Sequence, residues 1–244
     1  MREFFILAGG LLTIILVLYL ILGFAVEMAI PHLSPQIEQT IAAGLLPHMA
    51  ENNVDTIRSR KLQPLLDQLQ KRCAVLPYHC KVKIIDSPRV NALALPGGAI
   101  LIFSGLLDKL TSENELAFVL GHEMGHFVHR DHLRALGRGL AFLAISTTLF
   151  GPHNQITSLA TKFVNLTELS FSRHQEAAAD RYALEVLHCA YGHVEGALTF
   201  FKKLAAVQSS HANKVSFFSS HPLFPERIQN IKAYCRQQGF SCNR

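Results

Sequence analysis

No charged side chain occurs between Phe4 and Val26 of this chain. These 23 residues would span about 35 Å as an α-helix, enough to cross the hydrocarbon core of a bilayer. The run is too long for the apolar part of a cleaved signal peptide, and no convincing small-residue cleavage site follows it. We therefore predict an N-terminal transmembrane anchor within residues 1–30, with the lipid bilayer as its partner, and one domain over residues 31–244.

Lysine and arginine are scarce on both flanks of this anchor. The amino group and Arg2 precede it, against Glu3, whereas no Lys or Arg follows it until Arg58. The positive-inside rule then favours a cytoplasmic N-terminus and a domain outside the membrane, which in a Gram-negative bacterium is the periplasm. The bias is only about one or two charges, so a cytoplasmic domain is the alternative.

The five cysteines lack the C-x-x-C spacing of structural metal sites. Cys73 and Cys80 are seven residues apart, and so are Cys235 and Cys242. We predict that each pair forms a disulfide and that Cys189 is a buried thiol. Disulfides belong in oxidising compartments, which agrees with an exported domain, whereas five reduced cysteines would face the cytosol.

The chain also lacks internal repeats, low-complexity tracts and any stripe of alternating aromatic and basic residues. Its net charge of +5 comes from scattered Lys and Arg. Solvated faces with mild attraction to anionic lipid explain this charge, so we expect no nucleic-acid partner.

A second apolar run, Leu140 to Phe150, is followed by Gly151-Pro152. Its 11 residues are too few to span a bilayer. We therefore predict a core segment or a segment at the membrane surface.

The motif with the clearest chemistry is His122-Glu123-Met124-Gly125-His126. Ser112 and Glu115 predict a capping box at the start of a helix, and no proline interrupts residues 111–151. Histidines four apart lie on one helical face, so both imidazoles can reach one zinc ion. Glu123 is placed to take a proton from water on that ion. The alternative is an amphipathic core helix with two chance histidines.

A catalytic zinc usually has a third protein ligand. His132 lies ten residues after His122, which is the spacing of metzincins. However, His129 stands where their helix-breaking glycine would be, and no methionine follows Met124 to form a Met-turn. We therefore reject His132 as a ligand and interpret residues 129–132 as a polar helix end.

Glu176 is the better candidate. Glu176 and Asp180 are four apart, on one face of a predicted second helix, and the three alanines between them allow close approach of another helix. Glu176 would bind the metal, and Asp180 would accept the free N–H of a ligating histidine. A solvated acidic face that pairs with Arg173 or Arg181 explains the spacing equally well.

Four segments together resemble the HtpX and CAAX-prenyl-protease family of membrane-associated zinc metallopeptidases, which includes the Oma-type quality-control proteases. The matching segments are residues 121–132, Ser172 to Asp180, Asn91 to Gly98, and His221-Pro222 with Arg227-Ile228. Their order and spacing are kept over about residues 30–240.

The resemblance implies a gluzincin with one Zn²⁺ per chain. His122, His126 and Glu176 would be the ligands, with Asp180 behind them. Glu123 would be the general base.

The resemblance also assigns roles that spacing cannot. Asn91 and Ala92 would begin an edge strand that pairs with extended polypeptide substrates. His221 would lie near the metal, as an oxyanion stabiliser or as a fourth ligand that masks the site. Arg227 would be a structural or electrostatic support.

The predicted fold is a mostly helical α+β class, a zincin-like metallopeptidase domain with a small β-sheet beside the HExxH helix. We expect strands at 81–86 and 92–103, the latter folded at Pro96-Gly97-Gly98. Residues 31–72 are expected to be helical, with breaks at Pro31, Pro35, Pro47 and Pro64. Further helices are expected at 104–110, 113–131, 155–170, 174–190, 193–208 and 226–238.

The predicted function is a membrane-anchored, zinc-dependent metalloendopeptidase that cleaves misfolded or unassembled envelope proteins. The alternative is a latent or chaperone-like assembly factor that binds extended polypeptide in the same groove and rarely cleaves it. A prenylated-peptide protease is a distant third, because those relatives enclose their site within many membrane helices.

Overall fold

The computed structural model describes residues 1–50, 54–151, 170–209, 220–222 and 225–241. The chain divides into two compact units: residues 1–33 with 133–169, and residues 34–132 with 170–244. The boundary at residue 30 between anchor and catalytic domain stays a prediction.

The first unit contains two apolar helices. Helix α1 (Arg2–Ala29) has no buried residue and continues into the 3₁₀ turn η1 (Ile30–His32). Helix α6 (Asp131–Phe150) is 20 residues long. Both helices are long and apolar enough to cross a membrane by length and composition. Residues 140–150 are therefore the second half of a longer helix, and the length argument against a second span does not hold.

Helices α1 and α6 contact each other within this unit. A Cβ at Gly137 would lie 2.5 Å from Cγ1 of Val26, so the two helices meet closely there. Glu27 forms ion pairs with Arg134 and Arg138 of α6. These charges lie just beyond the uncharged run of α1, where a hydrocarbon core would end.

The second unit contains a four-stranded sheet in the order β1-β2-β4-β3. Its strands are β1 (Val54–Asp55), β2 (Lys81–Ile85), β3 (Ala92–Leu95) and β4 (Ala99–Phe103). Strands β2 and β4 are parallel, and the other two pairs are antiparallel. The turn η2 (Pro96–Gly98) joins β3 to β4, with positive φ at both glycines. The predicted strands are confirmed, and β3 lies at the sheet edge, whereas the two-residue β1 was not predicted.

Helices make up most of the described part of this unit. They are α2 (Pro35–Ala50), α3 (Thr56–Cys73), α4 (Ser104–Leu107), α5 (Glu113–Val128), α8 (Arg173–Tyr191), α9 (Ala197–Ser209) and α11 (Pro225–Gln238). The predicted helix at 155–170 falls almost wholly outside the described residues. Contrary to the prediction, Pro47 and Pro64 do not end a helix but lie inside α2 and α3. A proline inside a helix costs free energy because it removes one backbone hydrogen bond. Burial of Leu62, Leu66 and Leu69 on α3 offsets this cost for Pro64.

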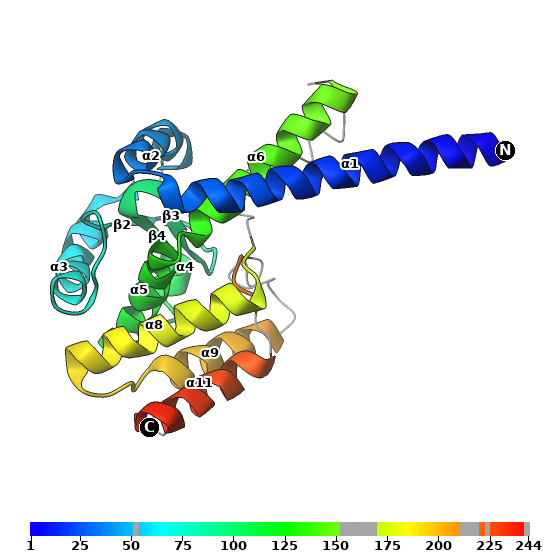
Figure 1. Cartoon of the computed structure of the whole chain (residues 1–244). Coiled ribbons are helices and arrows are strands. Elements are labelled where there is room, and N and C mark those ends of the chain that lie inside the picture. Colours follow the sequence, from blue (N-terminus) through cyan, green and yellow to red (C-terminus); the bar gives the residue numbers. More distant parts are fainter. Residues whose placement is uncertain (51–53, 152–169, 210–219, 223–224, 242–244) are drawn as a thin grey trace. The chain divides into compact units, whose positions relative to one another are not determined.

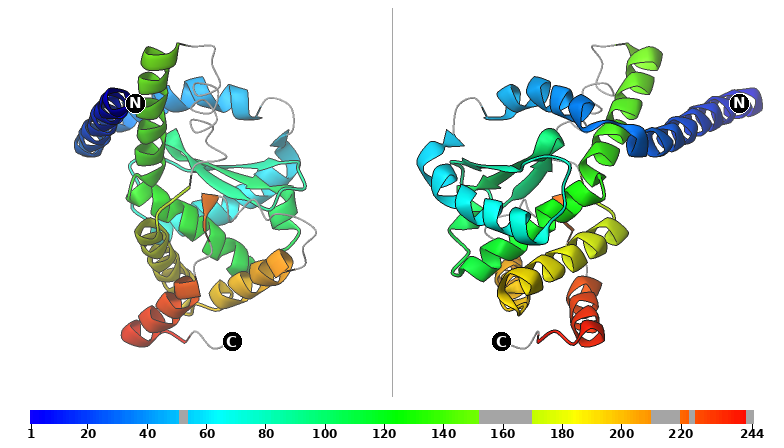
Figure 2. Two further views of the ribbon diagram at one scale, coloured as in Figure 1. Left: turned by 90° about the vertical axis from the view of Figure 1, so that its right-hand side faces the viewer. Right: turned by 60° about the vertical axis from the view of Figure 1, so that its left-hand side comes forward.

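Helix α5 lies between the sheet and α8 (Figures 1 and 2). A Cβ at Gly125 would lie 2.8 Å from Cα of Ala179, and a Cβ at Gly121 would lie 3.0 Å from Cα of Ala183. The two glycines are one helical turn apart, as are the two alanines. Small residues on both helices therefore let the two backbones approach closely, as the alanines of the second motif predict.

The disulfide pattern differs from the prediction. Cys73 bonds Cys189 and joins the last turns of α3 and α8, while Cys80 is a buried free thiol. Burial and the nearby carboxyl of Glu38 raise the pKa of Cys80 to about 12. Cys235 is disulfide-bonded, and its predicted partner Cys242 lies outside the described residues. Sequence spacing favoured the local pair and could not reveal that α3 and α8 end side by side.

We expect Gly125→Ala to destabilise the protein. The new methyl group would meet the backbone of α8. This overpacking should cost about 1–3 kcal/mol, which is more than alanine gains over glycine in helix propensity. Gly44→Ala is the matched control, because Gly44 is an exposed helical glycine with nothing within 4 Å of a Cβ. It should stabilise the chain by roughly 0.5–1 kcal/mol. Denaturant midpoints of the detergent-solubilised chain measure both, and equal shifts would contradict the packing argument.

Candidate metal centre

Helix α5 is capped much as predicted. The Ser112 hydroxyl accepts a hydrogen bond from the Glu115 backbone at 3.2 Å. The Glu115 carboxylate, however, accepts from the backbone N–H of Thr111 rather than that of Ser112, and also from Lys203 of α9. The helix that begins there buries His122, Glu123 and His126 almost completely.

Helix α8 begins just before the second motif. Ser172 and Gln175 form a reciprocal capping box at its N-terminus. Glu176 therefore lies in the first turn and Asp180 one turn later, and both side chains are buried. The solvated acidic face that spacing alone allowed is thereby excluded.

Four buried side chains converge between these helices. His122, His126, Glu176 and His221 each offer one ligand atom, and these atoms lie within 4.8 Å of one another. The two Nε2 atoms of His122 and His126 are 3.2 Å apart, and each is 3.6 Å from a carboxylate oxygen of Glu176. The structure thus brings together the three predicted ligands and His221, which the resemblance placed near the metal.

Two carboxyl groups determine which ring nitrogens face the centre. Asp131 Oδ2 lies 2.9 Å from His126 Nδ1, and Asp180 Oδ1 lies 3.0 Å from His122 Nδ1, although the latter contact departs from hydrogen-bond angles. A carboxylate only accepts, so both contacts favour the tautomer that carries its proton on Nδ1. Both Nε2 lone pairs then point into the same small space, an arrangement that a bound cation stabilises.

Arg227 balances part of the negative charge. Its guanidinium donates to both oxygens of Asp180, at 2.9 and 2.7 Å, and pairs with Glu176 Oε2 at 2.5 Å. Burial alone would raise the pKa of Glu176, but His221 and Arg227 outweigh it and hold that pKa well below its usual range. The pKa of Asp180 is likewise lowered, mainly by Arg227 against the effect of burial. The role of Arg227 as a structural or electrostatic support stays a prediction, and these contacts agree with it.

His221 touches three parts of the centre. Its Nδ1 lies 3.0 Å from Glu176 Oε1 and 3.2 Å from His122 Nε2. Its Nε2 lies 3.3 Å from the carbonyl oxygen of Ala92 and 3.5 Å from Glu123 Oε1. Burial alone would lower the pKa of His221, but Glu176 and Glu123 raise it. One imidazole therefore connects the ligand cluster to the first residue of the edge strand.

Asn91 is held inside the protein. Its side-chain oxygen accepts from the Ala92 backbone at 2.9 Å and from the Ser220 hydroxyl at 3.0 Å. Its backbone oxygen accepts from Phe103 of β4. Asn91 thereby positions the start of β3, and a substrate-binding role for Asn91 and Ala92 stays a prediction.

Sequence reasoning missed Asp131 and Phe171. Asp131 holds His126 as described above, and the ring of Phe171 stacks on His126 with centroids 3.9 Å apart. An acidic residue shortly after the second histidine was a usable signal for Asp131, because ligating histidines need an acceptor for their free N–H. The sequence carries no comparable signal for Phe171.

His132 is not in the ligand cluster, as predicted, but for a different reason. The helix does break, because Arg130 adopts φ 55° and takes the left-handed conformation expected of a glycine. His132 is then buried rather than at a polar helix end, with Nε2 2.8 Å from Glu38 Oε1.

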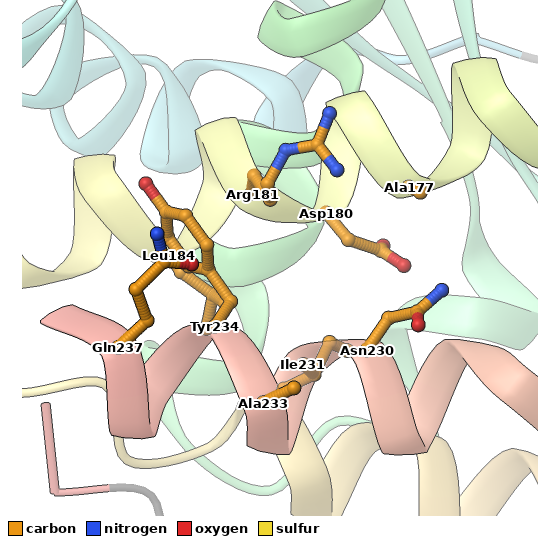
Figure 3. Close-up of a pocket in the computed structure, with 9 residues that line it drawn as sticks. All are labelled: Ala177, Asp180, Arg181, Leu184, Asn230, Ile231, Ala233, Tyr234 and Gln237. Carbon is orange, nitrogen blue, oxygen red and sulfur yellow. The ribbon is translucent and has the colours of Figure 1, made fainter.

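A groove between α8 and α11 lies beside the centre (Figure 3). Asp180 borders it together with Arg181, Asn230 and Tyr234. None of the four converging ligand residues lines this groove, so the groove is separate from the candidate metal centre.

Residues 56–235 match the family model of peptidase family M48. The chain therefore belongs to this family, which confirms the resemblance seen in its motifs. The match includes α3, the sheet from β2 onward, α5 and α8, which together carry every residue of the cluster except His221, and it continues through His221 and Arg227.

Several curated relatives are similar over this region. The chain is 35% identical over 159 residues to metalloprotease LoiP of Escherichia coli, covering 62% of this chain and 60% of the relative. It is 30% identical over 162 residues to metalloprotease YcaL of the same organism, covering 62% and 60%. It is 29% identical over 163 residues to the mitochondrial metalloendopeptidase OMA1 of Bos taurus, covering 62% and 31%. The similarity thus spans 60% or less of these three relatives.

We expect Arg227→Ala to destabilise the protein by about 3–5 kcal/mol, because Glu176 and Asp180 would be left buried without their cation. Arg58→Ala is the control, since Arg58 pairs with Asp55 at a side-chain exposure of 49%. Exposed ion pairs contribute about 0–1 kcal/mol. Urea unfolding followed by circular dichroism measures both variants. A small change for Arg227→Ala would show that the two carboxylates are not held by this guanidinium.

Proposed function

We propose that this chain is a membrane-anchored, zinc-dependent metalloendopeptidase of the gluzincin type, with a zincin-like catalytic domain over residues 31–244. His122, His126 and Glu176 are the zinc ligands in this proposal. The supporting observation is the convergence of two imidazole lone pairs on one buried carboxylate, each imidazole oriented from behind by an aspartate. Two histidines and one glutamate form a ligand set typical of catalytic zinc.

The buried charge also fits a divalent cation. Four buried carboxyl groups surround the histidines, and among the described residues one buried guanidinium, that of Arg227, faces them. The four are Glu123, Asp131, Glu176 and Asp180. Uncompensated buried charge is costly, so further positive charge is needed at this position.

Zinc, when bound, supplies Lewis acidity that acidifies water and polarises a peptide carbonyl. Glu123 is the general base in this proposal. Both of its carboxylate oxygens are buried and have no hydrogen-bond partner among the described residues, and Oε1 lies 3.5 Å from His221 Nε2. Both oxygens can therefore accept the proton of the attacking water. Glu123 then delivers that proton to the leaving amine.

Extended polypeptide is the proposed substrate, because β3 is the edge strand beside α5 and an edge can pair with an added strand. Such pairing reads the backbone rather than particular side chains and so suits unfolded segments. Misfolded or unassembled envelope proteins are the substrate class that the family resemblance implies.

Glu123→Gln should retain metal but lose casein cleavage by at least about 100-fold, since the amide cannot take the proton. The assay uses the full chain in detergent with added Zn²⁺, and a chelator should abolish the wild-type activity. Metal content by elemental analysis is the control for an intact site. Cleavage by Glu123→Gln at the wild-type rate would refute the proposed mechanism.

A second candidate function, a latent or chaperone-like factor that rarely cleaves, is supported by His221. This side chain contacts the ligand cluster and also the Ala92 carbonyl that an added strand would approach. In the same casein assay, activity in His221→Ala but not in wild type would indicate a peptidase held inactive by His221. Metal binding without cleavage in either protein would favour the binding function.

The proposed location places α1 in the membrane and the catalytic domain outside the cytoplasm. The Cys73–Cys189 disulfide and the bonded Cys235 support an oxidising compartment. The alternative is a cytoplasmic domain.

An alkaline phosphatase fused to the C-terminus should be active in a bacterial host, because that enzyme needs disulfides formed after export. A green fluorescent protein fused at the same position is the matched control and should be dark if the domain is exported through the general secretion route. The opposite pair of results would place the domain in the cytoplasm.

A further inference from the structure

One buried carboxylate oxygen outside the metal centre accepts from three donors. Glu38, in the first turn of α2, is 1% exposed. Its Oε1 lies 2.8 Å from His132 Nε2, 2.9 Å from the Tyr78 hydroxyl and 3.2 Å from the Gly97 backbone nitrogen. Burial alone would raise the pKa of Glu38, but the hydrogen bonds from His132 and Tyr78 outweigh burial and lower it. Three donors on one oxygen favour the ionised carboxylate, which only accepts.

The three donors come from separate parts of the unit. Gly97 forms the turn between β3 and β4, at the far end of the edge strand. Tyr78 precedes β2, and its ring packs edge-on against Phe127 of α5. His132 follows Asp131, and its Nδ1 lies 3.3 Å from the backbone oxygen of His126. Glu38 thus connects the edge-strand turn to the end of the helix that carries both ligand histidines.

The loop after α5 needs such a constraint. Asp131 reaches His126 only because the chain reverses through Arg130 in the left-handed region, which is unfavourable for a residue with a side chain. A strained conformation persists when surrounding contacts determine it. His132, held at one end by Glu38 and lying against the His126 backbone, supplies such contacts directly after the strained residue.

Helix α2 is also packed closely on the edge-strand turn. A Cβ at Gly97 would lie 2.7 Å from Cβ of Ala42, one turn after Glu38. The family match begins at residue 56, so α2 and Glu38 lie outside it.

We propose that Glu38 is a positioning residue of the metal centre, acting through His132 and Asp131 on His126 and through Gly97 on the edge strand. This inference rests on the proposed zinc site. The three donors to Glu38 are not among the four converging residues of the metal centre. Glu38 places α2, which directly follows the anchor segment in sequence, within the catalytic unit rather than in a linker.

The test is Co²⁺ binding by the full chain in detergent, followed by the visible absorption of the ion. Glu38→Ala should weaken Co²⁺ affinity by about tenfold, the lower end of the effect seen when groups behind metal ligands are removed. Glu38→Gln keeps the side-chain shape and one acceptor oxygen, so its Co²⁺ affinity should fall less, by about threefold. Gln36→Ala, at an exposed position of the same helix turn, is the matched control and should bind as wild type.

A second measurement separates positioning from general stability. Affinities are measured well below each variant's melting temperature, where a merely structural residue would leave the affinity of the folded fraction unchanged. The effects of Glu38→Ala and His132→Ala should also be less than additive, because both act through one contact.

Wild-type affinity in folded Glu38→Ala would overturn the inference while leaving the zinc site intact. If Glu38→Ala does not fold, the test uses Glu38→Gln and His132→Ala instead. Wild-type Co²⁺ affinity in both of these variants would overturn the inference. Absence of Co²⁺ binding in the wild type would overturn both this inference and the proposed zinc site.

Discussion

The close approach of α5 and α8 is the constraint on which the rest of the centre depends. Glu176 reaches His122 and His126 only because Gly121 and Gly125 leave no side chain between the helices and Ala179 and Ala183 leave almost none. Any larger residue there would separate the two backbones and move the carboxylate away from both imidazoles. The motif of α5 is therefore a packing surface as well as a ligand pair, since Gly125 lies between its two histidines in sequence.

Such close packing creates an electrostatic problem. It removes several carboxyl groups from water, and burial of a charge is costly unless partners replace the water. Arg227 supplies part of the compensation by bridging Glu176 and Asp180. The two aspartates in turn orient His122 and His126, so that the remaining negative charge and both lone pairs face one point. In the proposed metal site, metal affinity and fold stability would therefore be coupled, because the same contacts would serve both.

Local patterns predicted the elements well, because helix capping, periodicity and turn residues act over a few residues. The strands, the glycine turn and the helices of both motifs followed from such patterns, as did the face shared by Glu176 and Asp180. Contacts between segments that are distant in sequence could not be predicted from such local patterns. The Cys73–Cys189 pair depends on where α3 and α8 end, and the burial of His132 depends on Glu38, 94 positions away. The break at Arg130 was missed because the helix-breaking glycine would have stood at position 129, where the chain has His129. Contacts of the next two residues, Asp131 and His132, fix the chain directly after the break.

His221 shows why geometry alone leaves two functions in competition. A histidine so close to the ligands can stabilise a developing oxyanion, or it can occupy a coordination position and exclude water. Glu176 and Glu123 raise the pKa of His221, and an imidazole nitrogen must be unprotonated to bind a metal. Binding of a cation at the proposed site would therefore compete with protonation of His221. Whether His221 then donates to substrate or binds metal depends on how far it can move from the Ala92 carbonyl, where an incoming strand would compete for the same edge.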